Sequence, residues 1–235
     1  MRLCPVVLMR PKKYLAAKRT LMEKEQPSET RQVMAEVNRF YRTSFPGIFY
    51  TVFFKPVKGV LGLFENPSGD RFRNGLILMV STTLMYIFIP MLLLQWMDGN
   101  TSHLSFSVYF KMGMLVGTLL LLLSIFSFVI KVVHGRADLM AEFFTGGLCG
   151  IPLMLLMLLL TVLALLGKLS IYSVLTGNLF GSGIMMTAVV VYLLMFILNI
   201  LQQSFRAGGV GEARAWYAAP LLLIFSYWLS SQIFF

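Results

Sequence analysis

Long apolar runs separated by short polar segments dominate this chain from residue 75 onward. A helix needs about 20 apolar residues to cross the hydrocarbon core of a bilayer, and five uncharged runs have that length. They are residues 75–96, 112–130, 143–166, 183–201 and 216–235. The pattern therefore predicts an all-α polytopic membrane protein with five transmembrane helices.

The segment before the first run is apolar but too interrupted to cross a bilayer. Pro56 has no backbone donor and is expected to kink or restart a helix here, leaving two halves of about 15 Å each. On a helical wheel the segment shows an apolar face and a polar face. The apolar face carries Phe49, Phe53, Val57, Val60, Leu61 and Phe64. The polar face carries Thr51, Lys55, Lys58 and Gly62.

A basic face opposite an aromatic face is typical of a helix that lies in the membrane interface. The sequence thus predicts an amphipathic interfacial helix beneath the inner leaflet, with Arg71 and Arg73 holding the first span at the headgroups. The alternative is a helix buried among the spans, which Lys55 and Lys58 disfavour. The predicted lipid-interface residues are Phe49, Phe53, Lys55, Lys58, Phe64, Arg71 and Arg73.

The N-terminal region has a helical pattern of its own between Ser28 and Tyr41. This pattern predicts a short amphipathic helix that packs on the protein or the bilayer, and a partner-docking helix is the alternative. Three regions are expected: a basic cytoplasmic region at residues 1–44, an interfacial segment at 45–73 and a five-helix bundle at 74–235.

The positions of the cations predict the orientation of the chain. Residues 1–73 hold fourteen of the twenty Lys and Arg residues, and alternate inter-span segments divide the rest four to two in favour of the same side. Because cytoplasmic flanks accumulate Lys and Arg, the N-terminus is expected inside and the C-terminus on the opposite side. A bacterial inner membrane is favoured over a eukaryotic endomembrane.

Composition narrows the class of partner. The chain is 57% hydrophobic and 13% charged, against about 45–50% and about 25% in soluble domains. Its net charge of +10 comes without a nucleic-acid-binding module, so anionic lipid headgroups are the expected partners of the cations. Cys4 and Cys149 lie in unlike surroundings and predict neither a disulfide framework nor a metal site.

Small residues in the spans indicate close helix packing. Gly113 and Gly117 form one GxxxG pair, and Gly146 and Gly150 form another. Pro152 follows the second pair, and these five residues are the predicted packing positions. The alternative for residues 146–152 is a kinked or broken helix that lines a binding site.

No catalytic, metal-binding or cofactor-binding residues are predicted. His134, Asp138 and Glu142 follow at intervals of four, but His134 and Glu142 would stand about 12 Å apart on a helix, so a solvated loop is favoured. Ser182 lacks a supported histidine base, with His103 the candidate on its side of the membrane. The spans have no charged residue near their midpoints, which disfavours an ion-coupled transporter.

Two sequence elements, FFKPVKGVLGLFENPSGDRF and TGGLCGIPLMLL, together with five spans and an outside C-terminus, resemble the bacterial branch of the Yip (Ypt-interacting) family. The resemblance implies a non-catalytic membrane organiser that recruits partners or shapes lipid. The DLYGP-like motif of the eukaryotic members is missing, and Ile151 stands where a tyrosine is usual. Binding to Rab-type GTPases is therefore not implied.

The expected function is that of a non-catalytic membrane organiser, scaffold or partner-recruiting subunit acting through its basic head and interfacial helix. Its expected partners are anionic lipids and a protein partner or a second copy, without nucleic acid and without a cofactor. The alternative is a small transport component for lipid or another apolar substrate, or the membrane subunit of a larger transport or secretion complex. A membrane enzyme is the third possibility.

Overall fold

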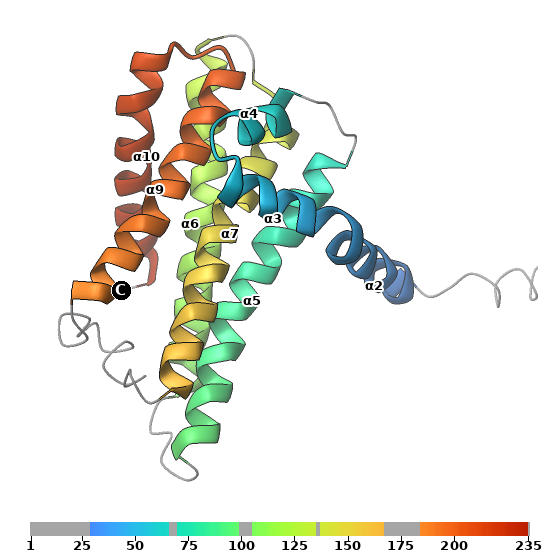
Figure 1. Ribbon diagram of the computed structural model, residues 1–235, viewed down its shortest axis with the longest axis vertical. Coiled ribbons are helices and arrows are strands. Elements are labelled where there is room, and N and C mark those ends of the chain that lie inside the picture. The colour runs from blue at the N-terminus through green and yellow to red at the C-terminus, as the bar shows by residue number, and fades with distance from the viewer. Residues whose placement is uncertain (1–28, 66–69, 99–104, 135–136, 167–183, 235) are drawn as a thin grey trace, which may run out of the picture. The chain divides into compact units, whose positions relative to one another are not determined.

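The computed structural model describes residues 29–65, 70–98, 105–134, 137–166 and 184–234. These residues are overwhelmingly helical and contain no strand, so the all-α prediction is confirmed. Five of the described helices are long and apolar enough to cross a membrane (Figure 1). They are α5 (Arg71–Asp98), α6 (Phe106–Val132), α7 (Leu139–Leu165), α9 (Ile184–Ala207) and α10 (Glu212–Phe234).

The five spans form one bundle. Helices α5, α6 and α7 contact one another, α9 packs on α7, and α10 packs on α6 and α9. Hydroxyl groups add bonds between helices: Tyr86 of α5 donates to the carbonyl oxygen of Leu153 in α7 over 3.0 Å, and Ser230 of α10 donates to that of Leu115 in α6 over 2.8 Å. Inside a bilayer the hydrophobic effect does not drive helices together, so hydrogen bonds of this kind help to hold the spans in contact.

Helices α5 and α7 approach each other closely at a pair of glycines. A Cβ atom added to Gly147 would lie 2.6 Å from the carbonyl oxygen of Gly75, and one added to Gly75 would lie 2.7 Å from the Cα atom of Phe144. Both obstacles are backbone atoms, which cannot rotate away. The sequence pattern of GxxxG pairs did not include this contact.

The four glycines that the sequence indicated also face neighbouring helices. A Cβ atom at Gly113 would lie 2.9 Å from the Thr83 carbonyl oxygen, and one at Gly146 would lie 2.6 Å from that of Leu120. At Gly117 and Gly150 the obstacles are threonine hydroxyls of α5, at 2.7 and 2.5 Å. Helix α7 runs without a break through Pro152, and residues 146–152 are all buried, so this segment forms a packed surface and not a broken helix.

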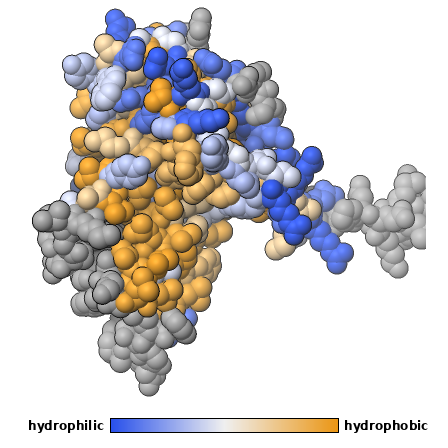
Figure 2. Space-filling view, viewed as in Figure 1, coloured by the Kyte–Doolittle hydropathy of each residue, from blue (hydrophilic) through white to orange (hydrophobic). Residues whose placement is uncertain are grey.

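The cations of the bundle gather at one end, which we call the basic end. It is the end where α5, α7 and α10 begin and where α6 and α9 end. Figure 2 shows hydrophilic residues over this end and an apolar surface further along the bundle. Among the described residues of the bundle and the segment before it, Lys111 lies at the other end. The basic end carries Lys55, Lys58, Arg71, Arg73, Lys131, Arg206 and Arg214.

Helix α2 (Glu29–Arg39) continues through a π-helical turn, η1 (Phe40–Ser44), into α3 (Phe45–Phe54). The chain divides into two compact units after Pro46. In the first unit the rings of Phe40, Tyr41 and Phe45 contact one another with centroids 5.2–6.2 Å apart. In α2 the apolar side chains of Val33 and Met34 are exposed.

We expect Gly147→Ala to destabilise the bundle by about 1–3 kcal/mol, because overpacking against backbone forces the two helices apart. Gly62→Ala in α4 (Lys58–Glu65) is the matched control, since nothing lies within 4 Å of a Cβ atom there. Thermal unfolding in mild detergent measures the difference. A Gly147→Ala protein as stable as the Gly62→Ala protein would contradict the close approach of α5 and α7.

Candidate functional site

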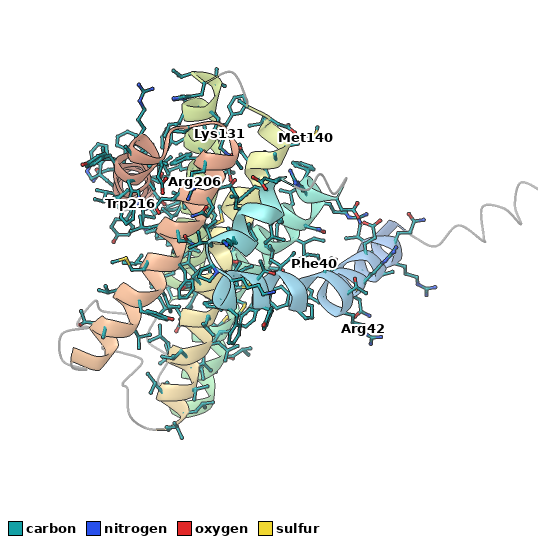
Figure 3. All side chains as sticks on the ribbon, turned by 45° about the horizontal axis from the view of Figure 1, so that its top comes forward. Phe40, Arg42, Lys131, Met140, Arg206 and Trp216 are labelled. Atoms are coloured by element: carbon teal, nitrogen blue, oxygen red, sulfur yellow. The ribbon has the colours of Figure 1, made fainter. Side chains whose placement is uncertain are left out.

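A buried ion pair joins α6 and α7 at the basic end. The Nζ atom of Lys131 lies 2.5 Å from Oε1 of Glu142, and the two residues are 4% and 2% exposed. Lys131 stands in the last turn of α6 and Glu142 in the first turn of α7. Each charge therefore complements the dipole of its own helix as well as its partner. Figure 3 shows Lys131 at the same end of the bundle as Arg206 and Trp216.

Three hydroxyl groups complete the hydrogen bonds of this pair. Ser127 and Thr145 both donate to Oε2 of Glu142, over 2.6 and 3.1 Å. Lys131 also donates to Ser204 of α9 over 2.6 Å, and the Ser204 and Thr145 hydroxyls are 2.8 Å apart. Because Thr145 gives its proton to Glu142, Ser204 must donate to Thr145. The network thus closes through three helices.

Aromatic and small residues enclose the lysine. The ring of Phe64 in α4 lies 5.8 Å from Nζ of Lys131 and also contacts the ring of Phe144, with centroids 6.0 Å apart. A cation near an aromatic ring gains further stabilisation where water is excluded. A Cβ atom at Gly208 would lie 2.6–2.9 Å from the methylene groups of Lys131. The lysine side chain therefore occupies space that only glycine at position 208 leaves free.

This ion pair corrects one expectation from the sequence. Lys131 and Glu142 were placed outside the spans, with Glu142 in a solvated loop, but both are buried within helices. The apolar runs end at the first charged residue, so a charged side chain that faces the bundle is predicted outside its span. Ser127 lies one turn before Lys131 and Thr145 one turn after Glu142, and this polar spacing was the available signal for a charge that faces inward.

The segment α3–α4 is docked on the bundle by one side. The helix breaks between Phe54 and Lys58, as the sequence predicted from Pro56. The carbonyl oxygen of Pro56, freed from helix pairing, accepts a 2.6 Å hydrogen bond from Nδ2 of Asn199 in α9. Val52 and Val60, one on each side of the break, are fully buried.

The other side of this segment stays exposed. Lys55 and Lys58 are exposed, and so are the large apolar side chains of Tyr50, Phe54 and Val57. One side of the segment is therefore buried against the bundle and the other is exposed, and its position at a membrane interface stays a prediction. Of the predicted interface aromatics, Phe53 contacts Phe196 of α9 with centroids 4.8 Å apart, Phe49 contacts Phe53 at a tilt of 50°, and Phe64 covers Lys131.

The arginines at the start of α5 lie at the basic end, where the sequence placed them. Arg73 forms a partly exposed ion pair of 3.0 Å with Asp70, and Arg71 lies in the same turn. Such exposed pairs contribute little to stability. Their position is consistent with side chains that extend into a headgroup layer.

The side chains of His134, Asp138 and Glu142 each have a different partner. His134 bonds through Nδ1 to the carbonyl oxygen of Ile130, Asp138 caps α7 by accepting from the amide of Met140, and Glu142 belongs to the ion pair. Among the described residues no group of three His, Cys, Asp or Glu side chains converges. His103 and Ser182 lie outside the described residues.

Comparisons with protein-family models, curated proteins and solved structures find no match to this chain. The resemblance to the Yip family therefore stays a prediction. The chemistry available is that of a satisfied buried ion pair and of a docked amphipathic segment with exposed cations.

We expect Glu142→Gln to destabilise the protein by about 3–5 kcal/mol, because it leaves the Lys131 charge buried without a counter-charge. The double variant Lys131→Met/Glu142→Leu removes both charges and should recover most of that loss. Asp70→Asn, which breaks the exposed pair with Arg73, is the control and should cost about 0–1 kcal/mol. Thermal unfolding in detergent measures all three, and equal losses for Glu142→Gln and Asp70→Asn would refute a desolvated pair.

Proposed function

We propose that this integral membrane protein is a non-catalytic membrane organiser, whose docked segment α3–α4 engages anionic headgroups of the cytoplasmic leaflet. The observation that supports this proposal is the two-sided burial of the segment. Val52 and Val60 are buried against the bundle, while Lys55 and Lys58 are exposed beside exposed aromatic residues. The bundle therefore supplies a fixed support, and the segment supplies a surface with the chemistry of a membrane interface.

Electrostatics favours the same proposal. Besides the buried Lys131, six cations lie at the basic end among the described residues from Lys55 onward, and a cation near an anionic membrane surface contributes about 1 kcal/mol. Cytoplasmic flanks of spans accumulate such residues, so the proposal includes a cytoplasmic basic end. The C-terminal end of α10 then lies on the opposite side.

A protein partner is proposed for the first unit of the chain. In helix α2 the neighbouring residues Val33 and Met34 are 59% and 71% exposed, and the partly exposed Val37 follows one turn after them. Apolar side chains repeated at intervals of three or four residues are the anchors by which an amphipathic helix enters a groove of a partner. The partner would be another membrane-associated protein or a second copy of this chain.

The buried Lys131–Glu142 pair favours one alternative, a small transport component, because ionisable groups inside spans commonly mark transport pathways. The pair is, however, hydrogen-bonded to Ser127, Thr145 and Ser204 and covered by Phe64, as a structural element would be. Lipid or solute flux across liposomes that hold this protein alone would establish the transport function instead.

We expect Lys55→Glu/Lys58→Glu to reduce the preference of the full-length protein for anionic over zwitterionic lipid by up to about tenfold. The measurement is the fraction of spin-labelled phosphatidylglycerol immobilised by the reconstituted protein, relative to labelled phosphatidylcholine. The control is Lys58→Glu/Glu65→Lys, which keeps the net charge of the segment. A preference unchanged in the first variant would refute the role of α3–α4.

A further inference from the structure

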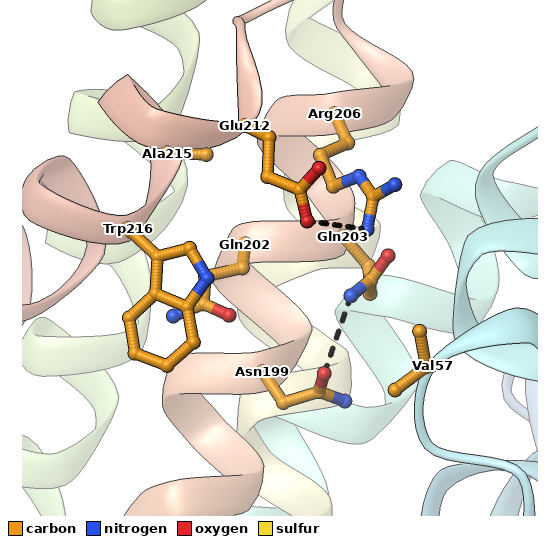
Figure 4. A pocket seen from close by; sticks show the side chains of 8 residues that line it. All are labelled: Val57, Asn199, Gln202, Gln203, Arg206, Glu212, Ala215 and Trp216. Carbon is orange, nitrogen blue, oxygen red and sulfur yellow. Dashed lines mark hydrogen bonds and ion pairs between the residues drawn. The ribbon is translucent and has the colours of Figure 1, made fainter.

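A small pocket lies where the break between α3 and α4 meets the basic ends of α9 and α10. It has a volume of about 210 Å³ and is lined by residues that include Val57, Gln203, Arg206, Glu212 and Trp216 (Figure 4). Drug-sized ligands occupy pockets of about 300–1,000 Å³. This pocket therefore suits a small polar group.

A buried amide in the pocket wall has an acceptor with no partner. Gln203 is 3% exposed, and its Oε1 atom has no hydrogen-bond partner among the described residues. Its orientation is set by a relay. The Pro56 carbonyl oxygen can only accept, so Asn199 presents Nδ2 to it and Oδ1 to Gln203, whose Nε2 donates over 3.3 Å. Oε1 is thereby left without a partner although it is buried, and an unsatisfied buried acceptor is costly.

The other groups of the pocket can meet a phosphate. Arg206 and Glu212 are 3.6 Å apart and 35% and 67% exposed, a loose pair that contributes little by itself. The guanidinium can therefore turn to a phosphate, which it binds through two parallel hydrogen bonds. Trp216 is 62% exposed at this end, where tryptophan commonly marks the membrane interface.

We propose that this pocket binds the headgroup of a phospholipid that carries a hydrogen-bond donor beyond its phosphate, such as the ammonium of phosphatidylethanolamine. Arg206 binds the phosphate, and the headgroup donor bonds to Oε1 of Gln203. The trimethylammonium of phosphatidylcholine has no N–H and leaves Gln203 unsatisfied. The site thus selects lipids by their donors and not by their net charge.

The surface beside the pocket can hold the acyl chains. Met195 lies about two turns before Gln202 on α9, and Ile224 lies about two turns after Trp216 on α10. Both side chains are exposed, by 59% and 66%. An apolar surface therefore continues from the pocket toward the middle of the membrane, and this continuity favours a lipid over a soluble phosphate compound.

This site goes beyond the electrostatic interaction proposed for α3–α4. Phosphatidylethanolamine and phosphatidylcholine carry the same net charge, so a preference between them does not depend on Lys55 or Lys58. The two proposals can accordingly fail separately.

The test is native mass spectrometry of the full-length protein titrated with dioleoyl-phosphatidylethanolamine and dioleoyl-phosphatidylcholine. We expect the first site to bind phosphatidylethanolamine about tenfold more tightly, as one satisfied buried acceptor predicts. Gln203→Met should abolish that preference. Equal dissociation constants for the two lipids in the natural protein would overturn the proposal.

Two variants that break the same ion pair separate binding from stability. Arg206→Gln removes the phosphate ligand and should weaken phosphatidylethanolamine binding about tenfold. Glu212→Gln frees the guanidinium and should leave that binding equal or tighter. Equal weakening in both variants would show that the ion pair only supports the fold, and would overturn the site even if Gln203→Met failed to fold.

Competition by an excess of soluble O-phosphoethanolamine distinguishes a site for a lipid headgroup from a site for a free phosphate compound. We expect the soluble compound to compete only at concentrations far above those of the lipid, because it lacks the contacts with α9 and α10. Saturation by the soluble compound at the concentration of the lipid would assign the site to a free phosphate compound and overturn the lipid assignment.

Discussion

Desolvation of the Lys131–Glu142 pair is the constraint on which the basic end of this protein depends. A buried charge is tolerated only with a counter-charge and a full set of hydrogen bonds, so the positions of Ser127, Thr145 and Ser204 are linked to one another. These residues come from α6, α7 and α9. The pair therefore ties three spans together at one level of the bundle.

The arrangement of α9 follows from that tie and positions the interfacial segment. Five and eight residues before Ser204, the same helix presents Asn199 to the carbonyl oxygen of Pro56 and Phe196 to Phe53. Phe64 closes over Lys131 from the other half of the segment. The segment is thus held on both sides of its break, by a hydrogen bond and by apolar contacts, and its cations remain outside.

The same geometry explains why a polar pocket exists beside an apolar bundle. The helix break leaves the carbonyl oxygen of Pro56 without a helical partner, because the amide of Val60 bonds instead to the carbonyl oxygen of Lys55. The Pro56 oxygen starts the relay through Asn199 to Gln203. Because the Pro56 oxygen accepts at one end of this relay, the relay ends at the other with the acceptor Oε1 of Gln203. The pocket therefore favours a ligand with a hydrogen-bond donor. The helix break that positions the segment is also the origin of this preference.

The sequence by itself determined the five spans and the break at Pro56, since both depend on local properties: the length of uncharged runs and the missing donor of proline. It did not determine that Lys131 and Glu142 face inward, that Gly75 meets Gly147, or that Gln203 is left with an open acceptor. Each of these depends on which residue of another helix stands opposite, and that is decided by the rotation and register of packed helices. Neither quantity is encoded in hydropathy, so only the tertiary structure established them.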